Sequence, residues 1–314
     1  GFTHSFVGLA LLAAVLTLVL WFTDRRLRSR DSSPAEERSP CKPFRLFWLC
    51  YLGGLGHTFF DYTNSYGVRP FLPFSNRWYY GDLIFVVDPW ILLILGASAV
   101  WLTATNAKRI VLWLAVGVLP SLLIVLVRES VAQPGLLIPA TVRLLWFLGL
   151  ALIVAGSVLR WSRAGPVLAQ ASLLLLVAYY AGMTVARQSA VRQARSAAAG
   201  TVNSAVAWPA PADPSTWQAV ITSPQGVQTG WIRLSDDSRP QWTEVTGLQP
   251  GLVAALRSND RSRTFLDFAR FFDARVLENE SGYAIQARDL RFTLRMNALV
   301  DREDVVKSVD IRWY

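Results

Sequence analysis

The chain has 314 residues, of which 53% are apolar, and its mean hydropathy is +0.32. The apolar residues lie in long blocks, which excludes an ordinary soluble globular protein. The net charge of +9 would suit a nucleic-acid partner, but the positive residues follow membrane topology instead. The two cysteines, one in a charged loop and one in a predicted span, do not suggest a disulfide framework.

Six apolar windows are long enough to predict helices that cross about 30 Å of hydrocarbon. Trp and Tyr side chains gather near the ends of these windows, as expected for anchors at the membrane interface. The predicted fold is an α-helical polytopic membrane bundle of about six spans, followed by a small, mostly antiparallel β (α+β) domain. The windows are residues 6–22, 44–60, 83–103, 110–127, 144–159 and 167–185.

Three regions are predicted along the chain: a membrane domain over 1–186, a polar helical stalk and linker over 187–207, and a β-rich extramembrane domain over 208–314. In the last region, alternating apolar residues and turn residues predict short strands and hairpins. The expected strands are 217–223, 228–234, 275–278, 283–287, 289–295 and 305–313, with a short helix over 265–272.

Positive residues predict the orientation of the spans. The three loops on one side of the predicted spans carry eleven Lys and Arg, and the loops on the other side carry three. Because cytoplasmic loops are enriched in positive residues, the richer side is assigned to the cytoplasm. The start of the first span, residues 57–82 and the C-terminal domain then lie outside. Arg187, Arg192 and Arg195 oppose this assignment, and a miscounted span would move the C-terminal domain to the other side.

Both histidines of the chain lie at the edge of a predicted span. His4 precedes the first span, and His57 lies near the end of the second, four residues before Asp61. Two spans joined by one loop are antiparallel, so all three side chains are expected to lie together. Two imidazoles and one carboxylate, with a position left for water, are typical of a hydrolytic divalent metal site, with zinc the preferred ion. The alternative for His57 and Asp61 is a surface ion pair at helical spacing, or a contact that only supports another ligand.

Three further residues on the same side are candidates for the site. Asp82 either caps the third helix or supports the site. Asp88 lies within the third apolar window, which favours a role in orienting a ligand histidine, binding a second ion or acting as a base. Arg69 either holds a phosphate by bidentate contact or extends toward lipid headgroups.

Four segments together resemble a known family: GFTHS at 1–5, HTFFDYTNSYGVR at 57–69, LPFS at 72–75 and GDLIFVVDP at 81–89. They are similar to the YdjM-like family of bacterial inner-membrane proteins, described as metal-dependent hydrolases and distantly similar to the helical zinc-dependent phospholipase C group. The resemblance implies that His4, His57 and Asp61 are metal ligands. It also implies a phosphoester substrate, such as a lipid headgroup.

Members of that family usually begin with an additional helix, which has a Thr-His near its start and is followed by a Pro-Asp-x-Asp segment. Neither feature occurs here. Either the chain is truncated at its N-terminus or part of the site is absent.

The sequence therefore predicts a multi-pass inner-membrane protein with a metal-dependent hydrolase site outside the cytoplasm. Its expected partners are the lipid bilayer and a phospholipid or other lipid-linked substrate, and no nucleic acid is expected. One alternative is a membrane scaffold in which the ion only joins the spans. The other is a transporter with Asp82 and Asp88 along its path, which is disfavoured because the later spans hold almost no ionisable residues.

Overall fold

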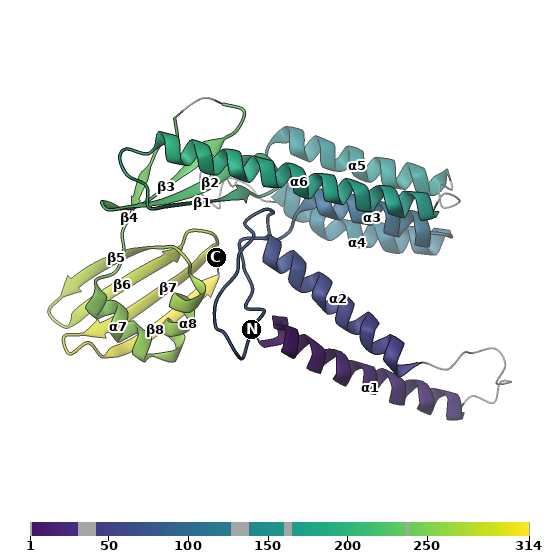
Figure 1. Ribbon diagram of the computed structural model, residues 1–314, viewed down its shortest axis with the longest axis horizontal. Helices are drawn as coiled ribbons and strands as arrows, with labels where there is room; N and C mark the ends of the chain where they lie inside the picture. The colour runs from purple at the N-terminus through teal and green to yellow at the C-terminus, as the bar shows by residue number, and fades with distance from the viewer. Residues whose placement is uncertain (1, 31–41, 127–137, 160–164, 237–238, 314) are drawn as a thin grey trace. The chain divides into compact units, whose positions relative to one another are not determined.

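The computed structural model describes residues 2–30, 42–126, 138–159, 165–236 and 239–313 (Figure 1). The loop residues Arg38, Cys41, Arg128, Arg160 and Arg163 lie outside these ranges. Contacts divide the chain into two compact units. The helical unit is Gly1–Ser189 with Trp208–Trp217, and the sheet unit is Ala190–Ala207 with Gln218–Tyr314.

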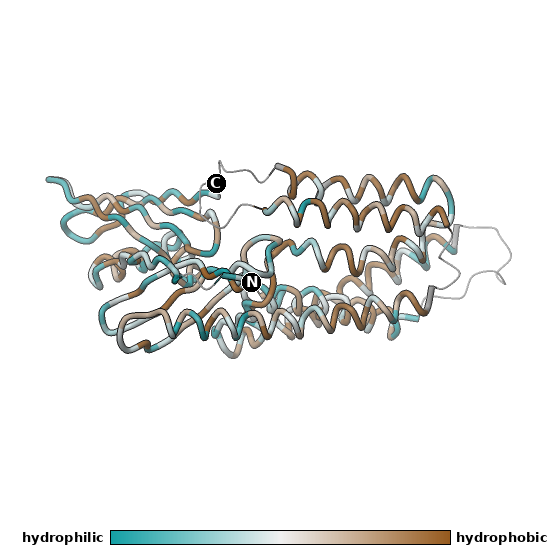
Figure 2. The backbone as a smooth tube through the Cα atoms, turned by 90° about the horizontal axis from the view of Figure 1, so that it is seen from above, coloured by the Kyte–Doolittle hydropathy of each residue, from teal (hydrophilic) through white to brown (hydrophobic). Residues whose placement is uncertain are grey.

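A helix occupies each of the six apolar windows. After a single 3-10 turn, η1 (Phe2–His4), these helices are α1 (Phe6–Arg30), α2 (Pro43–Thr63), α3 (Pro89–Thr103), α4 (Ala107–Leu126), α5 (Ala140–Val158) and α6 (Gly165–Ala197). Figure 2 shows that hydrophobic residues cover most of these helices. Many of their leucines and valines are exposed, as in Leu11, Val15 and Leu174. Such surfaces suit a lipid environment.

Three segments of the described chain are long and apolar enough to cross a membrane: Phe6–Arg28, Ala140–Val158 and Val167–Ala197. Pro89–Thr103 is also apolar but is shorter, because α3 begins at Pro89 rather than at the predicted residue 83. The segment before it, 81–88, is not helical. The predicted start of the third helix is therefore wrong by six residues.

Helices α1 and α2 form an antiparallel hairpin and lie side by side (Figure 1). Gly54 permits this close approach, because a Cβ atom there would lie 2.8 Å from Leu9 Cδ2. Small residues at a contact between membrane helices allow the backbones to pack closely. The hairpin brings the beginning of α1 beside the end of α2.

A second helical contact is organised by tryptophans. Trp146 of α5 is buried and donates from Nε1 to Ser121 Oγ of α4 at 3.0 Å, and Trp101 of α3 donates to the Ile153 carbonyl at 2.9 Å. Each indole therefore contributes apolar area and also satisfies its only donor, as buried tryptophans require.

The C-terminal part contains two four-stranded sheets with the orders β1-β2-β3-β4 and β5-β6-β7-β8. The first is built from β1 (Ser204–Ala210), β2 (Asp213–Ser223), β3 (Gly226–Arg233) and β4 (Thr243–Val245). The second is built from β5 (Phe272–Asn279), β6 (Gly282–Asp289), β7 (Leu294–Asp301) and β8 (Val306–Trp313), with antiparallel pairing throughout. Helices α7 (Pro250–Ser258) and α8 (Asp260–Phe268) pack on one face of the second sheet through Leu256, Phe265 and Met296.

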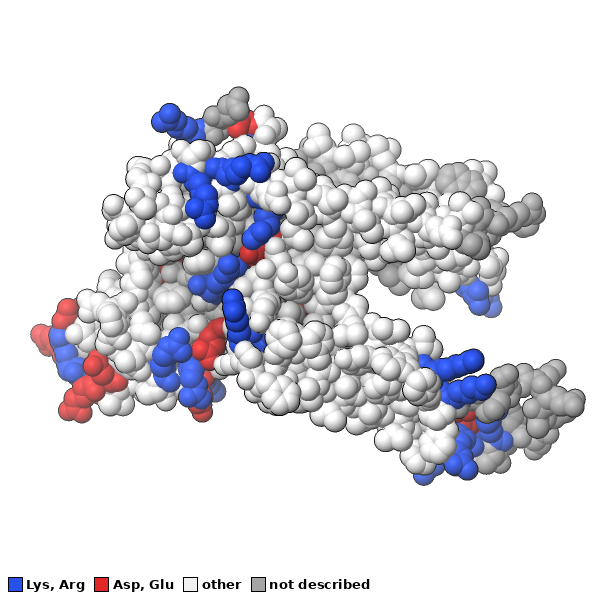
Figure 3. Space-filling model, viewed as in Figure 1, with Lys and Arg blue, Asp and Glu red and all other residues white. Residues whose placement is uncertain are grey.

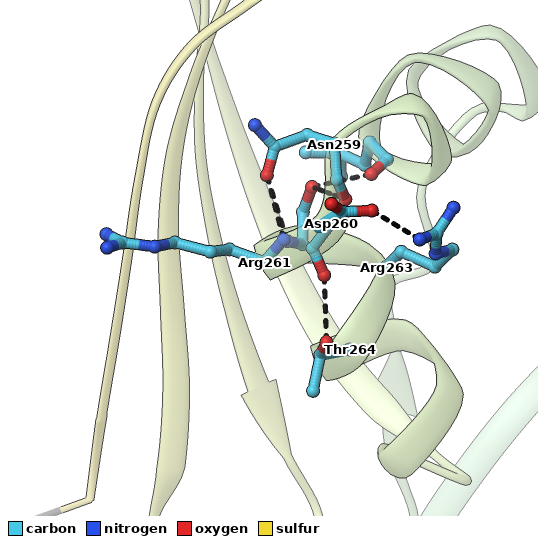
Figure 4. Close-up of polar contacts among 7 residues, drawn as sticks. Asn259, Asp260, Arg261, Arg263 and Thr264 are labelled. Atoms are coloured by element: carbon cyan, nitrogen blue, oxygen red, sulfur yellow. Dashed lines mark hydrogen bonds and ion pairs between the residues drawn. The ribbon is translucent and has the colours of Figure 1, made fainter.

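Capping determines where α8 begins (Figure 4). The Asn259 side chain accepts hydrogen bonds from the backbone N–H groups of Arg261 and Ser262, at 3.0 and 3.4 Å. Asp260 pairs with Arg263, and Thr264 Oγ1 donates to the Asp260 carbonyl at 2.8 Å. An asparagine cap followed by an acidic residue in the first turn is favourable at a helix N-terminus.

The sheet predictions are partly confirmed. The hairpins β2–β3 and β5–β6 and the last strand fall where the alternation predicts them. The predicted helix over 265–272 is displaced, because α8 ends at Phe268 and β5 begins at Phe272. The predicted strand over 289–295 is wrong, because β6 ends at Asp289, a bend follows, and β7 begins at Leu294.

Candidate metal centre

The η1 turn holds His4 just before α1. Ser5 is fully buried, donates from Oγ to the Phe2 carbonyl at 2.7 Å and accepts from the Gly8 N–H at 3.0 Å. Serine thereby caps α1 in the manner expected of an N-cap residue. Gly8 is required here, because a Cβ atom would lie 2.0 Å from the Phe2 carbonyl oxygen. This packing fixes the backbone from which His4 projects.

Helix α2 presents His57 and Asp61 one turn apart near its C-terminal end. His57 Nε2 lies 3.5 Å from Asp61 Oδ2. From the neighbouring element, His4 Nε2 lies 3.2 Å from the same oxygen, and the two imidazole centroids are 5.3 Å apart. The antiparallel hairpin thus brings together the three side chains that the sequence singles out.

The spacing of these groups fits a metal ion. One ligand atom from each residue lies within 4.8 Å of the others. In a tetrahedral zinc site with bonds of about 2.0–2.1 Å, ligand atoms lie roughly 3.3–3.4 Å apart, so small side-chain rotations would suffice. Two imidazole nitrogens and a carboxylate oxygen are also donors that zinc accepts readily.

Exposure differs among the three residues. The side chains of His4 and Asp61 are 33% and 24% exposed, whereas that of His57 is 67% exposed. Burial lowers the pKa of the His4 imidazole, and the nearby Asp61 carboxylate opposes this shift. A lowered pKa favours the neutral imidazole, which is the form that binds metal. The cluster is therefore partly accessible and has a histidine suited to ligation.

A loop over 64–88 continues from the C-terminal end of α2 and is connected to both helices of the hairpin. The Phe6 N–H donates to the Pro70 carbonyl at 3.0 Å, and the Leu83 N–H donates to the Thr63 carbonyl at 2.8 Å. Val68 and Tyr79 form an antiparallel bridge with two hydrogen bonds of 2.9 Å. The loop is thus bonded to residues close in sequence to both His4 and Asp61.

Arg69 belongs to this loop. Its Nη1 donates to Asn76 Oδ1 at 2.7 Å, and its guanidinium lies 4.6 Å from the Trp78 ring centroid. The side chain is half-buried. A guanidinium held over an indole keeps its charge and is pre-oriented for contact with an anion.

Asp88 has a structural use that the sequence did not assign to it. It is the N-cap of α3, and its Oδ1 accepts from the N–H groups of Trp90 and Ile91 at 3.0 and 3.2 Å. Its Oδ2 accepts from the Tyr179 hydroxyl of α6 at 2.8 Å. The sequence analysis predicted Asp82 as a possible cap of the third helix, but the capping residue is Asp88. Asp88 therefore lies before the helix and not inside it.

Asp82 is buried and adopts a positive φ of 54°. Its Oδ2 lies 3.8 Å from Nη2 of Arg187 in α6. Neither Asp82 nor Asp88 belongs to the group of potential ligands formed by His4, His57 and Asp61. Within the described chain, the structure connects both aspartates to α6.

Sequence reasoning missed the contribution of α6 to this region. Besides the contacts of Tyr179 and Arg187, the Tyr180 hydroxyl lies 3.1 Å from Thr63 Oγ1, and the Tyr180 ring packs 5.8 Å from Phe59. Two adjacent tyrosines inside an apolar run were the available signal, because buried tyrosine hydroxyls need partners. Their partners lie about a hundred residues away and cannot be found from local patterns.

The part of the chain that holds the candidate site matches a known protein family. Residues 1–132 match the model of the YdjM inner membrane protein family. Residues 1–132 of the chain are therefore similar to this family. The match confirms the resemblance predicted from the sequence and supports a membrane location. It includes all six predicted site residues, and both sheets lie outside it. No curated protein and no solved structure matches the chain.

Proposed function

We propose that this chain is a membrane-bound, metal-dependent hydrolase acting on a phosphoester or related lipid-borne bond. The convergence of His4, His57 and Asp61 at one end of the α1–α2 hairpin carries the proposal. Three protein ligands leave a coordination position for water, as in hydrolytic zinc sites. Ionisable groups placed at a membrane boundary are costly, which favours a functional use for them.

Each residue has a proposed task. His4, His57 and Asp61 would hold a divalent ion, with zinc the best match to the donors. The bound ion would supply a water of lowered pKa and a positive centre for a phosphoryl oxygen. Arg69, oriented by Asn76 and Trp78, would hold a phosphate oxygen of the substrate. Asp88 and Asp82 would position α3 and α6 around the site rather than touch the reacting atoms.

We further propose six membrane spans, with the site outside the cytoplasm. Figure 3 shows Lys and Arg side chains gathered over the end of the α1–α2 hairpin where the loop joins the two helices. His4, His57 and Asp61 lie at the opposite end of the same hairpin. The positive-inside rule then assigns the basic end to the cytoplasm and the site to the other face. By the same count of spans, the C-terminal domain lies outside.

The decisive experiment compares metal content and hydrolysis in four purified proteins without a polyhistidine tag: wild type, His57→Ala, Asp61→Asn and Asp24→Asn. Asp24 is the matched control, because it pairs with Arg28 at the basic end of α1. Wild type and the control should retain about one equivalent of zinc or a similar ion and should hydrolyse a chromogenic phosphodiester. The two ligand variants should lose the ion and at least about 100-fold of the activity, since even outer contacts of a metal change affinity by 10- to 100-fold.

A well-folded wild type without metal, even after incubation with zinc, would contradict the proposal. The alternative is a structural ion that joins η1 to α2, favoured by the fact that its ligands come from two separate elements. In that case the ion would be retained, turnover of phosphoesters would be absent, and the ion would bind no exchangeable water.

Arg69 provides a separate prediction about substrate binding. Arg69→Gln should raise KM for a phosphodiester by about tenfold or more, because a charged hydrogen bond contributes about 1.5–3 kcal/mol. The metal content should be unchanged. Arg77→Gln is the control, since Arg77 belongs to the same loop and packs on Tyr79. Equal KM values for the two variants would remove Arg69 from the site.

A further inference from the structure

The sheet β5–β8 has two chemically different faces. On one face, alternate residues such as Ala274, Ile285 and Met296 pack against α7 and α8. Alternation along each strand sends the intervening residues to the opposite face. That face carries a row of charged residues across all four strands, paired in the order Asp273, Arg288, Arg295, Arg312. The next row is Arg275, Gln286, Asn297, Asp310.

A pocket of about 450 Å³ lies on this face. Its size falls in the range of small-ligand sites, about 300–1,000 Å³. The polar groups that line it come from three adjacent strands of the sheet unit. They are Asp273, Arg275, Gln286, Arg288, Arg295 and Asn297.

Arginines outnumber acidic residues in the lining of the pocket. Three arginines face one aspartate, and Arg288 Nη2 lies 3.6 Å from Asp273 Oδ2. Arg288 and Arg295 are direct cross-strand neighbours, and like charges in such pairs destabilise a sheet. Within the described residues, the Arg275 side chain forms no ion pair. An anion bound here would offset the like charges of Arg288 and Arg295 and accept hydrogen bonds from the Arg275 guanidinium.

The donors favour phosphate. A guanidinium presents two parallel N–H groups that match the oxygens of a phosphate. The amides of Gln286 and Asn297 can donate to and accept from hydroxyl groups beside such a phosphate. The site therefore suits a phosphorylated, hydroxyl-bearing group rather than an apolar ligand.

The position of the sheet unit in the chain suggests a source for a phosphorylated ligand. Helix α6, which is long and apolar enough to cross a membrane, ends at Ala197, and β1 begins at Ser204. The six intervening residues reach at most about 20 Å. The sheet unit therefore follows, in sequence, a helix that can cross a membrane.

We propose that the arginine-lined pocket of β5–β7 binds the phosphorylated headgroup of an anionic phospholipid. This inference does not depend on the proposed hydrolase activity, since it concerns different residues in the other unit. The pocket would hold the C-terminal domain against an anionic lipid surface.

The test measures the binding of short-chain lipids to the full chain in a non-ionic detergent, by native mass spectrometry with titration. The probes are dioctanoyl phosphatidylglycerol, dioctanoyl phosphatidylcholine and inorganic phosphate. The pocket variant is Arg275→Gln with Arg295→Gln. The matched control is Arg257→Gln with Arg263→Gln, which removes two arginines paired with Asp267 and Asp260 on α7 and α8.

The pocket variant should bind phosphatidylglycerol at least about tenfold more weakly than wild type, while the control changes Kd by less than twofold. Binding of phosphatidylcholine should be weak and equal in all proteins. An Arg275→Lys, Arg295→Lys variant keeps the charge but lacks the paired N–H groups of guanidinium. Its Kd for phosphatidylglycerol should lie between those of wild type and the glutamine variant. Circular dichroism confirms that each variant is folded.

Three results would overturn the proposal. Equal weakening in the control would show a general effect of net charge. Phosphatidylcholine binding with the same arginine dependence would show that the anionic headgroup is not recognised. Inorganic phosphate binding as tightly as phosphatidylglycerol, again with the same dependence, would assign the pocket to free phosphate rather than to lipid.

Discussion

Each unit contains a cluster of carboxylate and basic side chains. The two clusters differ in burial and in how many of their polar atoms have hydrogen-bond partners. In the sheet unit, Asp289 and Arg291 are fully buried and make three mutual hydrogen bonds of 2.7–3.2 Å. The Arg291 guanidinium also lies about 5 Å from the rings of Phe268 and Phe292. In the helical unit, a single Asp61 oxygen faces two partly exposed imidazoles at 3.2 and 3.5 Å.

The difference indicates what each cluster is suited for. A buried network in which every group is satisfied makes one arrangement unique and has no capacity left for a ligand. An open cluster of imidazoles and a carboxylate retains lone pairs that a cation can use. Pairs of carboxylate and basic side chains therefore stabilise the fold in the sheet unit, whereas in the helical unit they are available to bind a ligand.

Breaking the buried pair should have the largest effect. Asp289→Ala should destabilise the sheet β5–β8 by about 3–5 kcal/mol, because Arg291 would keep a buried charge without its partner. Hydrogen exchange of β5–β7 amides measures this effect. Asp267→Ala, at an exposed pair with Arg257, is the control and should cost less than about 1 kcal/mol. Equal exchange in both variants would show that the buried pair is dispensable.

Zinc should stabilise the helical unit and leave the sheet β5–β8 unchanged. Zinc at about a hundredfold its Kd should stabilise the helical unit by about 2.7 kcal/mol, since it binds only the folded state. Thermal unfolding followed in the presence and absence of zinc measures this shift. His57→Ala should lose it, and β5–β7 exchange should not respond to zinc in either protein. A zinc response that survives in His57→Ala would place the ion elsewhere.

The cap at α3 should produce the smallest of these effects. Asp88→Ala removes the N-cap and the acceptor of the Tyr179 hydroxyl, and should destabilise the helical unit by about 1–2 kcal/mol. Asp88→Asn keeps an effective cap and should cost less. Both variants should retain wild-type metal content. Loss of metal in Asp88→Asn, measured with folding intact, would show that Asp88 contributes to metal binding.

The approach of His4 to His57 and Asp61 could be deduced from the sequence, because two spans joined by one loop must be antiparallel and the His-x3-Asp spacing follows the helical period. Their role as ligands stays a prediction. The cap at Asp88 could not be deduced, since it depends on where α3 begins, and Pro89 at its first turn decides that. The contacts of Tyr179 and Arg187 were also hidden, because they join segments about a hundred residues apart.

In the sheets, local alternation predicted hairpins well but failed between Asp289 and Leu294. There the alternating pattern continues through a bend, and the bend is stabilised by the Asp289–Arg291 pair and by the Leu290 N–H bonded to the Phe271 carbonyl at 3.0 Å. Periodicity records which residues are apolar, and it does not distinguish one strand from two strands joined by a tight bend. The arginine-lined face of β5–β8 could not be predicted either, because it depends on the register of four strands.

The placement of both histidines at one cluster has a practical consequence for spectroscopy. The whole chain contains no other imidazole, and the two rings lie 5.3 Å apart. Selective isotope labelling of histidine in a preparation without a polyhistidine tag would therefore give a magnetic resonance spectrum with signals from this cluster alone. A protein of 34.9 kDa in a detergent micelle would then report the tautomers and occupancy of one site without any resonance assignment beyond two rings.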